Sequence, residues 1–380
     1  MPSWKGKQKA LARADDGGGT TAGVVIPLEL SGSGIYDVAY TVPVSIGYGD
    51  QKFSLEVDTG SSDLWVASTS CSSSACGHTG GSNYDPSTSG KETGLYFSIN
   101  YLSGSVSGPV YWDRVTVGGY SIENQALAAA SSVTDEDLAP DFSGILGLAL
   151  PLNSIIAENI PPVTNNSPDG AAWASNLFSI TPTSNAPSSR FLSLSLSRPG
   201  SDRIPSYLGI GKHPPDLVND PSQIHYSTVV SNTAGSLFWK ASVRDITVWV
   251  DGQPRPVDIG RSNTGAVFPS AVIDSGVPYI FTTSKVANAI YGALDVHPAS
   301  DGNYYVPCKT PLNMTISLDD RPALSLHPLD VTAEPPKDNN ADFCIGLIQA
   351  ADGQLSNPNS HIGDIILGVP FMRNVYTVMA

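Results

Sequence analysis

The stretch LEVDTGSSDLWV, residues 55–66, is a β-type run that breaks at an Asp, a Thr and a Gly. A second stretch, AVIDSGVPYIFT at residues 271–282, breaks in the same way at Asp274, Ser275 and Gly276. Asp58 and Asp274 are 274 − 58 = 216 residues apart. One such triplet is weak evidence, because any tight turn can carry it. Two copies, each ending a strand-like run, indicate that the chain uses the same local structure twice.

A second pair of matching segments supports an internal duplication. GILG ends at Gly147, 147 − 58 = 89 residues after the first aspartate, and IILG ends at Gly368, 368 − 274 = 94 residues after the second. Two halves that repeat both segments at nearly equal distances are typical of a duplicated fold. A duplicated fold places equivalent points opposite each other across a pseudo-twofold axis. We therefore expect Asp58 and Asp274 to meet.

Composition favours an all-β protein with few short helices. The chain has 380 residues, of which 41% are apolar and 14% charged, which is typical of two globular domains or one large β-rich unit. Runs with period-two alternation, such as KFSLEVD and GPVYWDRVTVGG, are bounded by Gly, Pro, Asn or Asp. One helix is expected within residues 283–296, TSKVANAIYGALDV, capped by Thr283 or Ser284.

The charge balance argues against two classes of partner. Thirty-five acidic and 20 basic residues give a formal net charge of −15. Such a surface repels nucleic acid and anionic membrane, so we expect neither as a partner. No apolar run reaches the length of a transmembrane helix. The acidity is also compatible with work at low pH.

Four cysteines, at positions 71, 76, 308 and 344, form one local pair in each half. This arrangement predicts two disulfides and an oxidising compartment. The alternative is a zinc site made by Cys71, Cys76 and His78, which lacks a second pair at ligand spacing. Sequons at Asn165 and Asn313 are candidate glycosylation sites compatible with secretion.

The N-terminal segment, residues 1–26, has basic residues but no apolar core of signal-peptide length. We therefore expect no signal peptide in this chain and interpret the segment as a leader or the remnant of a pro-segment, as in a zymogen.

Two neighbouring aspartates suit a specific chemistry. Carboxyl groups a few ångströms apart cannot both ionise cheaply, so they share one proton. The ionised member takes a proton from a water held between them, and the protonated member polarises a substrate carbonyl. The products form through a tetrahedral diol, without a metal, cofactor or covalent intermediate. The glycine after each aspartate allows a close backbone approach, and the hydroxyl of Thr59 or Ser275 can bond across the interface.

With these features the chain resembles the pepsin-like aspartic peptidases, including fungal secreted members, over roughly residues 27–380. FSLEVDTGSSDLWVAS resembles the first active-site segment of that family, NYLSGSVSG its hairpin flap, CSSSAC its first disulfide loop, and GILG and IILG the turns behind the aspartates. The resemblance implies catalytic roles for Asp58 and Asp274. It implies supporting or substrate-binding roles for Thr59, Gly60, Ser61, Trp65, Ser275, Gly276, Tyr101, Ser103, Gly104 and Ser105.

The resemblance also implies a bilobal fold and an extended peptide as partner. An N-terminal lobe at 27–195 would carry Asp58 and the flap, and a C-terminal lobe at 196–380 would carry Asp274. The implied disulfides are Cys71–Cys76 and Cys308–Cys344. We expect a monomeric aspartic endopeptidase that is secreted, or alternatively vacuolar, and that cleaves peptide or unfolded protein at acid pH.

The pattern departs from the family at two places. Ser61 stands where the family has a hydroxyl that bonds the first aspartate, but the matching position after Asp274 is Val277, which cannot donate. We expect Asp274 to hold the shared proton more strongly as a result. The resemblance also implies a shortened C-terminal lobe, because a further strand follows GVPFMRNVYTVMA in the family.

Two alternative functions stay open. The first is a catalytically silent relative that binds peptide or protein, with Val277 and the short C-terminus as its support. The second is a glycosidase, which also uses two carboxylates but does not explain the duplicated turns. The sequence contains no G-x-S-x-G elbow, no H-E-x-x-H motif and no phosphate loop.

Overall fold

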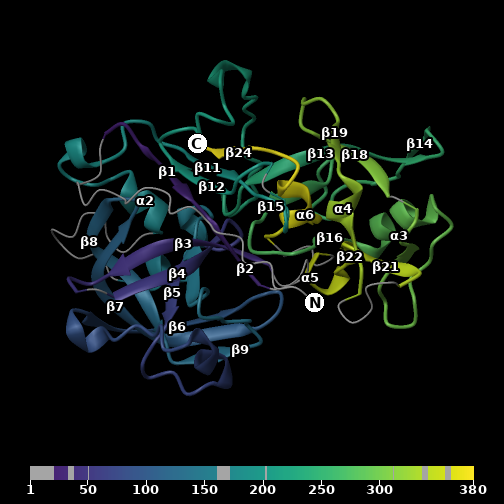
Figure 1. Cartoon of the computed structure of the whole chain (residues 1–380). Coiled ribbons are helices and arrows are strands. Elements are labelled where there is room, and N and C mark those ends of the chain that lie inside the picture. Colours follow the sequence, from purple (N-terminus) through teal and green to yellow (C-terminus); the bar gives the residue numbers. More distant parts are fainter. Residues whose placement is uncertain are drawn as a thin grey trace.

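The computed structural model describes residues 21–32, 38–49, 51–160, 172–201, 203–310, 312–335, 341–355 and 361–380. Strands dominate these residues and the helices are few and short, as predicted from composition. In Figure 1 most strands of the first half of the chain, in purple to teal, lie on one side, and most strands of the second half, in green and yellow, lie on the other.

The first half forms a nine-stranded sheet. Its order is β2-β3-β4-β10-β5-β8-β7-β6, β9 pairs with β7, and β3 also pairs with β7. Period-two burial along β7 shows why the alternating sequence forms a half-buried strand. The strands are β2 (Glu29–Ser31), β3 (Ala39–Ile46), β4 (Gln51–Asp58), β5 (Leu64–Ala67), β6 (Lys91–Asn100), β7 (Ser105–Val117), β8 (Tyr120–Ala130), β9 (Ser132–Thr134) and β10 (Gly144–Gly147).

The second half forms an eight-stranded sheet of order β19-β18-β13-β15-β23-β16-β22, with β14 on β13, and a three-stranded sheet of order β17-β21-β20. The strands are β13 (Lys240–Val250), β14 (Gln253–Pro256), β15 (Ser270–Ile273), β16 (Ile280–Thr282), β17 (Tyr305–Pro307), β18 (Asn313–Leu318), β19 (Leu324–Leu326), β20 (Thr332–Ala333), β21 (Phe343–Gly346), β22 (Ile348–Ala350) and β23 (Ile365–Leu367).

The two sheets contain the same four-strand unit. In the first, β10 pairs parallel to β4 and antiparallel to β5, and β5 pairs parallel to β8. In the second, β23 pairs parallel to β15 and antiparallel to β16, and β16 pairs parallel to β22. Gly147 lies opposite Asp58 in the first unit, and Leu367 lies opposite Ile273 in the second. The internal duplication predicted from sequence is thus present in the topology.

A four-stranded sheet joins residues far apart in the sequence. Its order is β1-β12-β11-β24, so the strand nearest the C-terminus pairs with β11 beside the first half (Figure 1). Its strands are β1 (Val24–Pro27), β11 (Leu192–Ser195), β12 (Tyr207–Ile210) and β24 (Thr377–Met379).

Buried polar side chains also connect the two halves. The Tyr40 hydroxyl accepts a hydrogen bond from Arg373 Nε at 2.9 Å and donates one to the Ser197 carbonyl. A second contact of this kind lies within the second half, where Arg198 pairs with the buried carboxylate of Asp330 through two of its nitrogens. Buried pairs of this kind are costly to break from one side, because the remaining charge loses its partner.

The helices are short, and the one expected within 283–296 covers less of the sequence than predicted. The described helices are α1 (Ile155–Asn159), α2 (Trp173–Leu177), α3 (Ser284–Gly292), α4 (Pro328–Val331), α5 (Asp352–Leu355) and α6 (Val369–Met372). α3 ends at Gly292. Thr283 occupies its N-cap position without a side-chain bond, and the Ser284 N–H instead donates to the Asp352 carboxylate. The cap thus comes from a distant residue.

Both predicted disulfides are present. Cys71 and Cys76 are bonded across a separation of 5 residues, and Cys308 and Cys344 across 36. The zinc site considered for Cys71, Cys76 and His78 is therefore wrong, because a disulfide leaves neither sulfur free to bind a metal. Within the described ranges, no group of three or more metal-binding side chains is found elsewhere.

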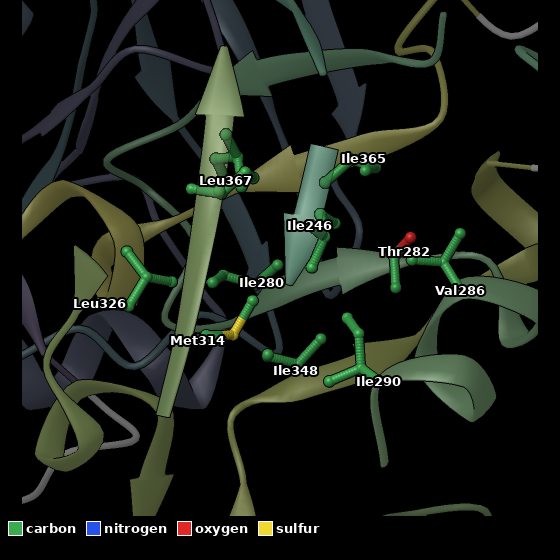
Figure 2. A pocket seen from close by; sticks show the side chains of 11 residues that line it. Ile246, Ile280, Thr282, Val286, Ile290, Met314, Leu326, Ile348, Ile365 and Leu367 are labelled. Atoms are coloured by element: carbon green, nitrogen blue, oxygen red, sulfur yellow. The ribbon is translucent and has the colours of Figure 1, made fainter. Parts of the chain in front are cut away.

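The core of the second half contains a cavity of about 10 Å³. Figure 2 shows its wall, which consists of aliphatic and Met side chains with Thr282 among them, from β13, β16, α3, β18, β19, β22 and β23. The Thr282 hydroxyl is buried without a hydrogen-bond partner among the residues described. This space is a packing defect in an apolar core and is not shaped to hold a polar ligand.

Two further expectations can be compared with these residues. Of the segment 1–26 that was predicted as a leader, residues 1–20 lie outside the described residues. Its last residues, Val24 to Ile26, belong to strand β1. Among the helices that the structure describes, none has the length and apolar character needed to cross a bilayer.

Candidate active site

Asp58 is the last residue of β4 and is buried. The strand ends here because Gly60 and the two serines after it turn the chain toward β5. The Asp58 carboxylate accepts hydrogen bonds from the Gly60 N–H at 2.7 Å and from the Ser61 hydroxyl. The Leu148 N–H, at the end of the GILG turn, fixes the Asp58 carbonyl at 2.6 Å. Strand, turn and second strand together hold this carboxyl group in one orientation.

Asp274 directly follows β15 and is equally buried. Its N–H donates to the Leu367 carbonyl at 3.1 Å, at the end of the IILG turn. The Gly276 N–H donates to its carboxylate at 3.0 Å. Val277 packs beside it in an apolar cluster and supplies no donor. The two aspartates therefore have equivalent backbone settings but unequal side-chain support.

The two turns cross and bind each other. Thr59 N–H donates to the Ser275 hydroxyl at 3.1 Å, and Ser275 N–H donates to the Thr59 hydroxyl at 2.9 Å. Each hydroxyl then donates to a backbone carbonyl of the opposite strand, that of Ile273 or Val57. These four bonds are related by an approximate twofold. They fix the separation of the two turns.

The glycines bring the two carboxyl groups together. A Cβ added to Gly60 would lie 2.2 Å from a carboxylate oxygen of Asp274, and one added to Gly276 would lie 2.6 Å from a carboxylate oxygen of Asp58. Real Cβ atoms do not approach oxygens so closely, so only glycine fits at either position. Each aspartate thus faces the turn of the other.

The electrostatics of the pair are unequal. Burial raises the pKa of the Asp274 carboxyl well above its usual range, and the charge of Asp58 and a hydrogen bond with Asp58 raise it further. The Gly276 N–H opposes this shift in pKa. Val277 adds no donor to the ionised form of Asp274.

The predicted flap is the hairpin of β6 and β7, with residues 101–104 at its tip. The Tyr101 N–H donates to the Gly104 carbonyl at 3.1 Å, which closes the turn. Trp65, fully buried on β5, donates its indole N–H to the Tyr101 hydroxyl at 2.8 Å. Leu102 packs against the cluster that contains Val277, so the tip reaches the second half.

The other residues predicted from sequence have weaker structural support. Ser103 is exposed and Ser105 begins β7, and neither side chain has a hydrogen-bond partner in the described part of the chain. Gly104 has φ of 81°, which favours glycine. Asn313 is exposed at the start of β18, whereas Asn165 lies outside the described residues.

Sequence reasoning missed Asp63, which lies just after the first turn. Its buried carboxylate accepts bonds from the Ser154 hydroxyl at 2.6 Å and from the N–H groups of Ile155 and Ile156 at 2.9 and 3.1 Å. In the second half, the Asp364 carboxylate likewise accepts hydrogen bonds from the Ser262 hydroxyl and from the N–H groups of Asn263 and Ser270. These carboxylates anchor loops behind the aspartates. The available signal for Asp63 was a charged residue directly before the apolar run LWVA.

Two glutamates near Asp58 were also missed. Glu56 is buried two residues before it, and Glu136 lies in the segment between β9 and β10. Glu56 stands in the opening stretch of sequence, and its charge within a buried strand could have been noticed.

Comparison with known proteins agrees with this geometry. The model of the family described as "Eukaryotic aspartyl protease" matches residues 39–380. Penicillopepsin-1 of Penicillium rubens is 30% identical over 374 residues, covering 95% of this chain and 81% of its own. Pepsin A of Sus scrofa is 30% identical over 352 residues, covering 90% and 78%.

A third relative, major aspartyl peptidase 1 of Cryptococcus neoformans var. grubii, is 26% identical over 356 residues. The match covers 90% of this chain and 66% of that protein's length.

Proposed function

The chain belongs to the eukaryotic aspartyl protease family, and from this premise we propose that it is an acid endopeptidase that hydrolyses peptide bonds with Asp58 and Asp274. The observation that carries the proposal is the approach of each carboxyl group to the glycine turn of the other half. Two carboxyl groups held this way can bind one water molecule between them.

In the proposed reaction Asp58 is ionised and Asp274 is protonated. Asp58 takes a proton from the water as the water oxygen attacks the substrate carbonyl carbon, and Asp274 gives its proton to the carbonyl oxygen. The resulting diol collapses when Asp58 returns its proton to the amide nitrogen and the C–N bond breaks. Asp274 recovers its proton from a diol hydroxyl. The hydrogen bonds from Gly60 and Ser61 to Asp58 support its role as the base.

The flap supports the binding of an extended peptide. The Trp65–Tyr101 bond and the packing of Leu102 fix the tip of the hairpin near both turns. Such a hairpin could offer backbone groups to a peptide and exclude water from it. We assign substrate contacts to Tyr101, Ser103, Gly104 and Ser105. The reaction needs no cofactor.

The proposed organisation has an N-terminal lobe at 27–195 and a C-terminal lobe at 196–380. Two disulfides and an exposed sequon at Asn313 fit a secreted protein, with the vacuole as the alternative site.

The test is cleavage of a denatured protein at acid pH by the purified chain. We expect the chain to cleave the denatured protein. A peptide inhibitor with a hydroxyl in place of the scissile carbonyl should abolish this cleavage. The second candidate is a silent relative that binds peptide without cleaving it, and the absence of a donor at Val277 favours it. Binding of the inhibitor without any cleavage would support that candidate and overturn the proposal.

A further inference from the structure

Glu56 is a buried carboxyl group that the proposed reaction does not use. It is only 7% exposed, and its backbone pairs with Ile145 on β10 and Thr41 on β3. Because side chains alternate along a strand, Glu56 and Asp58 lie on the same face of β4. The Glu56 side chain has no hydrogen-bond or ion-pair partner among the residues that the structure describes. A buried carboxyl group without a partner is costly, so its presence requires an explanation.

Glu136 lies between the same aspartate and the flap. β9 runs beside the start of β7, with Thr134 opposite Ser105, and this pairing brings Glu136 to the tip of the hairpin. A Cβ added to Gly104 would lie 2.8 Å from Glu136 Oε1. Glu136 is half-buried and also has no ion-pair partner in the described ranges. Two unpaired carboxyl groups therefore flank Asp58, one on the strand and one under the flap.

The charges around both glutamates are negative. Burial raises the pKa of Glu56 well above its usual range, and the charges of Asp58, Glu136 and Asp274 raise it further. Burial, followed by the charge of Asp58 and those of its own neighbours, raises the pKa of Glu136 to about 8. The titratable groups that act on the two glutamates or on adjoining Tyr101 are all acidic: Asp58, Asp63, Asp135, Asp137 and Asp274.

We propose that Glu56 and Glu136 form an acidic subsite that accepts the cationic side chain of a lysine or arginine beside the scissile bond. This inference rests on the proposed peptidase function. A lysine ammonium or arginine guanidinium donates several charge-assisted hydrogen bonds and would supply the partner that Glu56 lacks. The position of Glu56, two residues from the base, places the cation next to the reacting bond.

The subsite makes a distinctive prediction about pH. In the free protein the two glutamates are largely neutral at acid pH, because their pKa values are raised. A bound cation favours their ionised forms, so binding releases protons. The preference for a cationic over an apolar side chain should then grow with pH, by up to about tenfold per unit for each proton released. A neutral, apolar subsite would show no such dependence.

The experiment compares peptides that differ at one residue flanking the scissile bond, with lysine, norleucine or glutamine there. kcat/KM is measured between about pH 4 and 6, from the pKa of ordinary carboxyl groups upward. We expect lysine to exceed norleucine by about tenfold or more at the upper end, the effect of one charge-assisted hydrogen bond. The ratio should fall as the pH is lowered.

The variants Glu56→Gln and Glu136→Gln should each reduce this ratio, and the double variant should bring it to about one at every pH. Cleavage of the norleucine peptide should persist in all of them. Glu29→Gln, which changes an exposed glutamate on β2, is the matched control and should keep the full preference. If Glu56→Gln does not fold, Glu136→Gln alone must still lower the pH dependence of the ratio.

Equal cleavage of lysine and norleucine peptides, a preference for glutamine, or a lysine preference that survives in the double variant would overturn the subsite. If the wild type cleaves no peptide, the proposed function fails, and the subsite is judged by binding instead. Uncleavable hydroxyl analogues of the lysine and norleucine peptides serve for this purpose. Tighter binding of the lysine analogue to the wild type than to the double variant supports the subsite, and equal binding overturns it.

Discussion

The two aspartates differ in the number of donors that surround them, although their backbones are equivalent. Asp58 receives bonds from Gly60 and Ser61, whereas Asp274 receives one from Gly276 and lies beside Val277. Donors to an ionised carboxylate lower its pKa, and a missing donor leaves the neutral form favoured. Burial is the main cause of the raised pKa of Asp274, and we expect the side chain at position 277 to modulate how strongly the pair holds its proton.

Val277→Thr should restore a donor beside Asp274. A hydrogen bond to a charged group contributes about 1.5 kcal/mol, which corresponds to about one pKa unit. Because the new bond favours the ionised form, the upper apparent pKa of the pair should fall, and the alkaline limb of the pH–rate profile should move to lower pH. Profiles of kcat/KM against pH measure the shift.

Val277→Ala is the control for this substitution, since it changes the volume of the side chain without adding a donor. Its alkaline limb should stay where the wild type has it. Identical profiles for Val277→Thr and the wild type would show that Asp274 does not depend on this position.

At the scale of elements, the flap is held by a contact between two strands that belong to different parts of the sheet. Trp65 on β5 donates to the hydroxyl of Tyr101 at the end of β6. The bond is partly buried, so water competes with it less than at the open surface. It fixes the hairpin tip over the turn that carries Asp58.

We expect Trp65→Phe and Tyr101→Phe each to lower kcat/KM by about fivefold, the effect of one ordinary hydrogen bond. Since both substitutions remove the same bond, the double variant should be little worse than either single variant. The test is a double-mutant cycle, in which initial rates on one peptide substrate are measured for the wild type, both single variants and the double variant. Additive losses would mean that the two side chains act on the substrate independently.

The sequence could predict those elements whose signal is local. The paired turns at Asp58 and Asp274 were found because the same motif occurs twice, and the strands because their alternation is regular. The cap of α3 was missed because Asp352 is 68 residues from Ser284. Glu136 was missed for a similar reason, because its place beside Asp58 depends on the pairing of β9 with β7.

At the scale of the whole molecule, several carboxyl groups in and around the candidate site are fully or partly removed from water. Burial is the main reason that the pKa values of Glu56, Asp63 and Asp274 are raised, and that of Glu136 is about 8. In the unfolded chain the pKa values of these groups return to about 4. The folded protein therefore binds more protons than the unfolded one above that pH.

Stability should consequently decrease as the pH rises. The contribution of a carboxyl group with a raised pKa is fully present below its unfolded pKa and is lost as the pH passes its folded pKa. For Glu136 this window ends at about pH 8. His213 and Lys240, whose pKa values are lowered by burial, oppose the trend, but they are fewer than the four carboxyl groups.

Thermal unfolding between about pH 4 and 8 tests this expectation. We expect Tm to fall across the range, and to fall less steeply in Glu56→Gln, which removes one of the four groups. A Tm that rises or stays constant as the pH increases would contradict it.

The central claim is that Asp58 and Asp274 act as a pair, and the rate of peptide cleavage by Asp58→Asn and Asp274→Asn at acid pH tests it most directly. Asp320→Asn, at an exposed position, is the control. The account predicts that each active-site variant folds and loses about 10³-fold or more of kcat/KM, while the control keeps its activity. Near-wild-type cleavage by either active-site variant would contradict it.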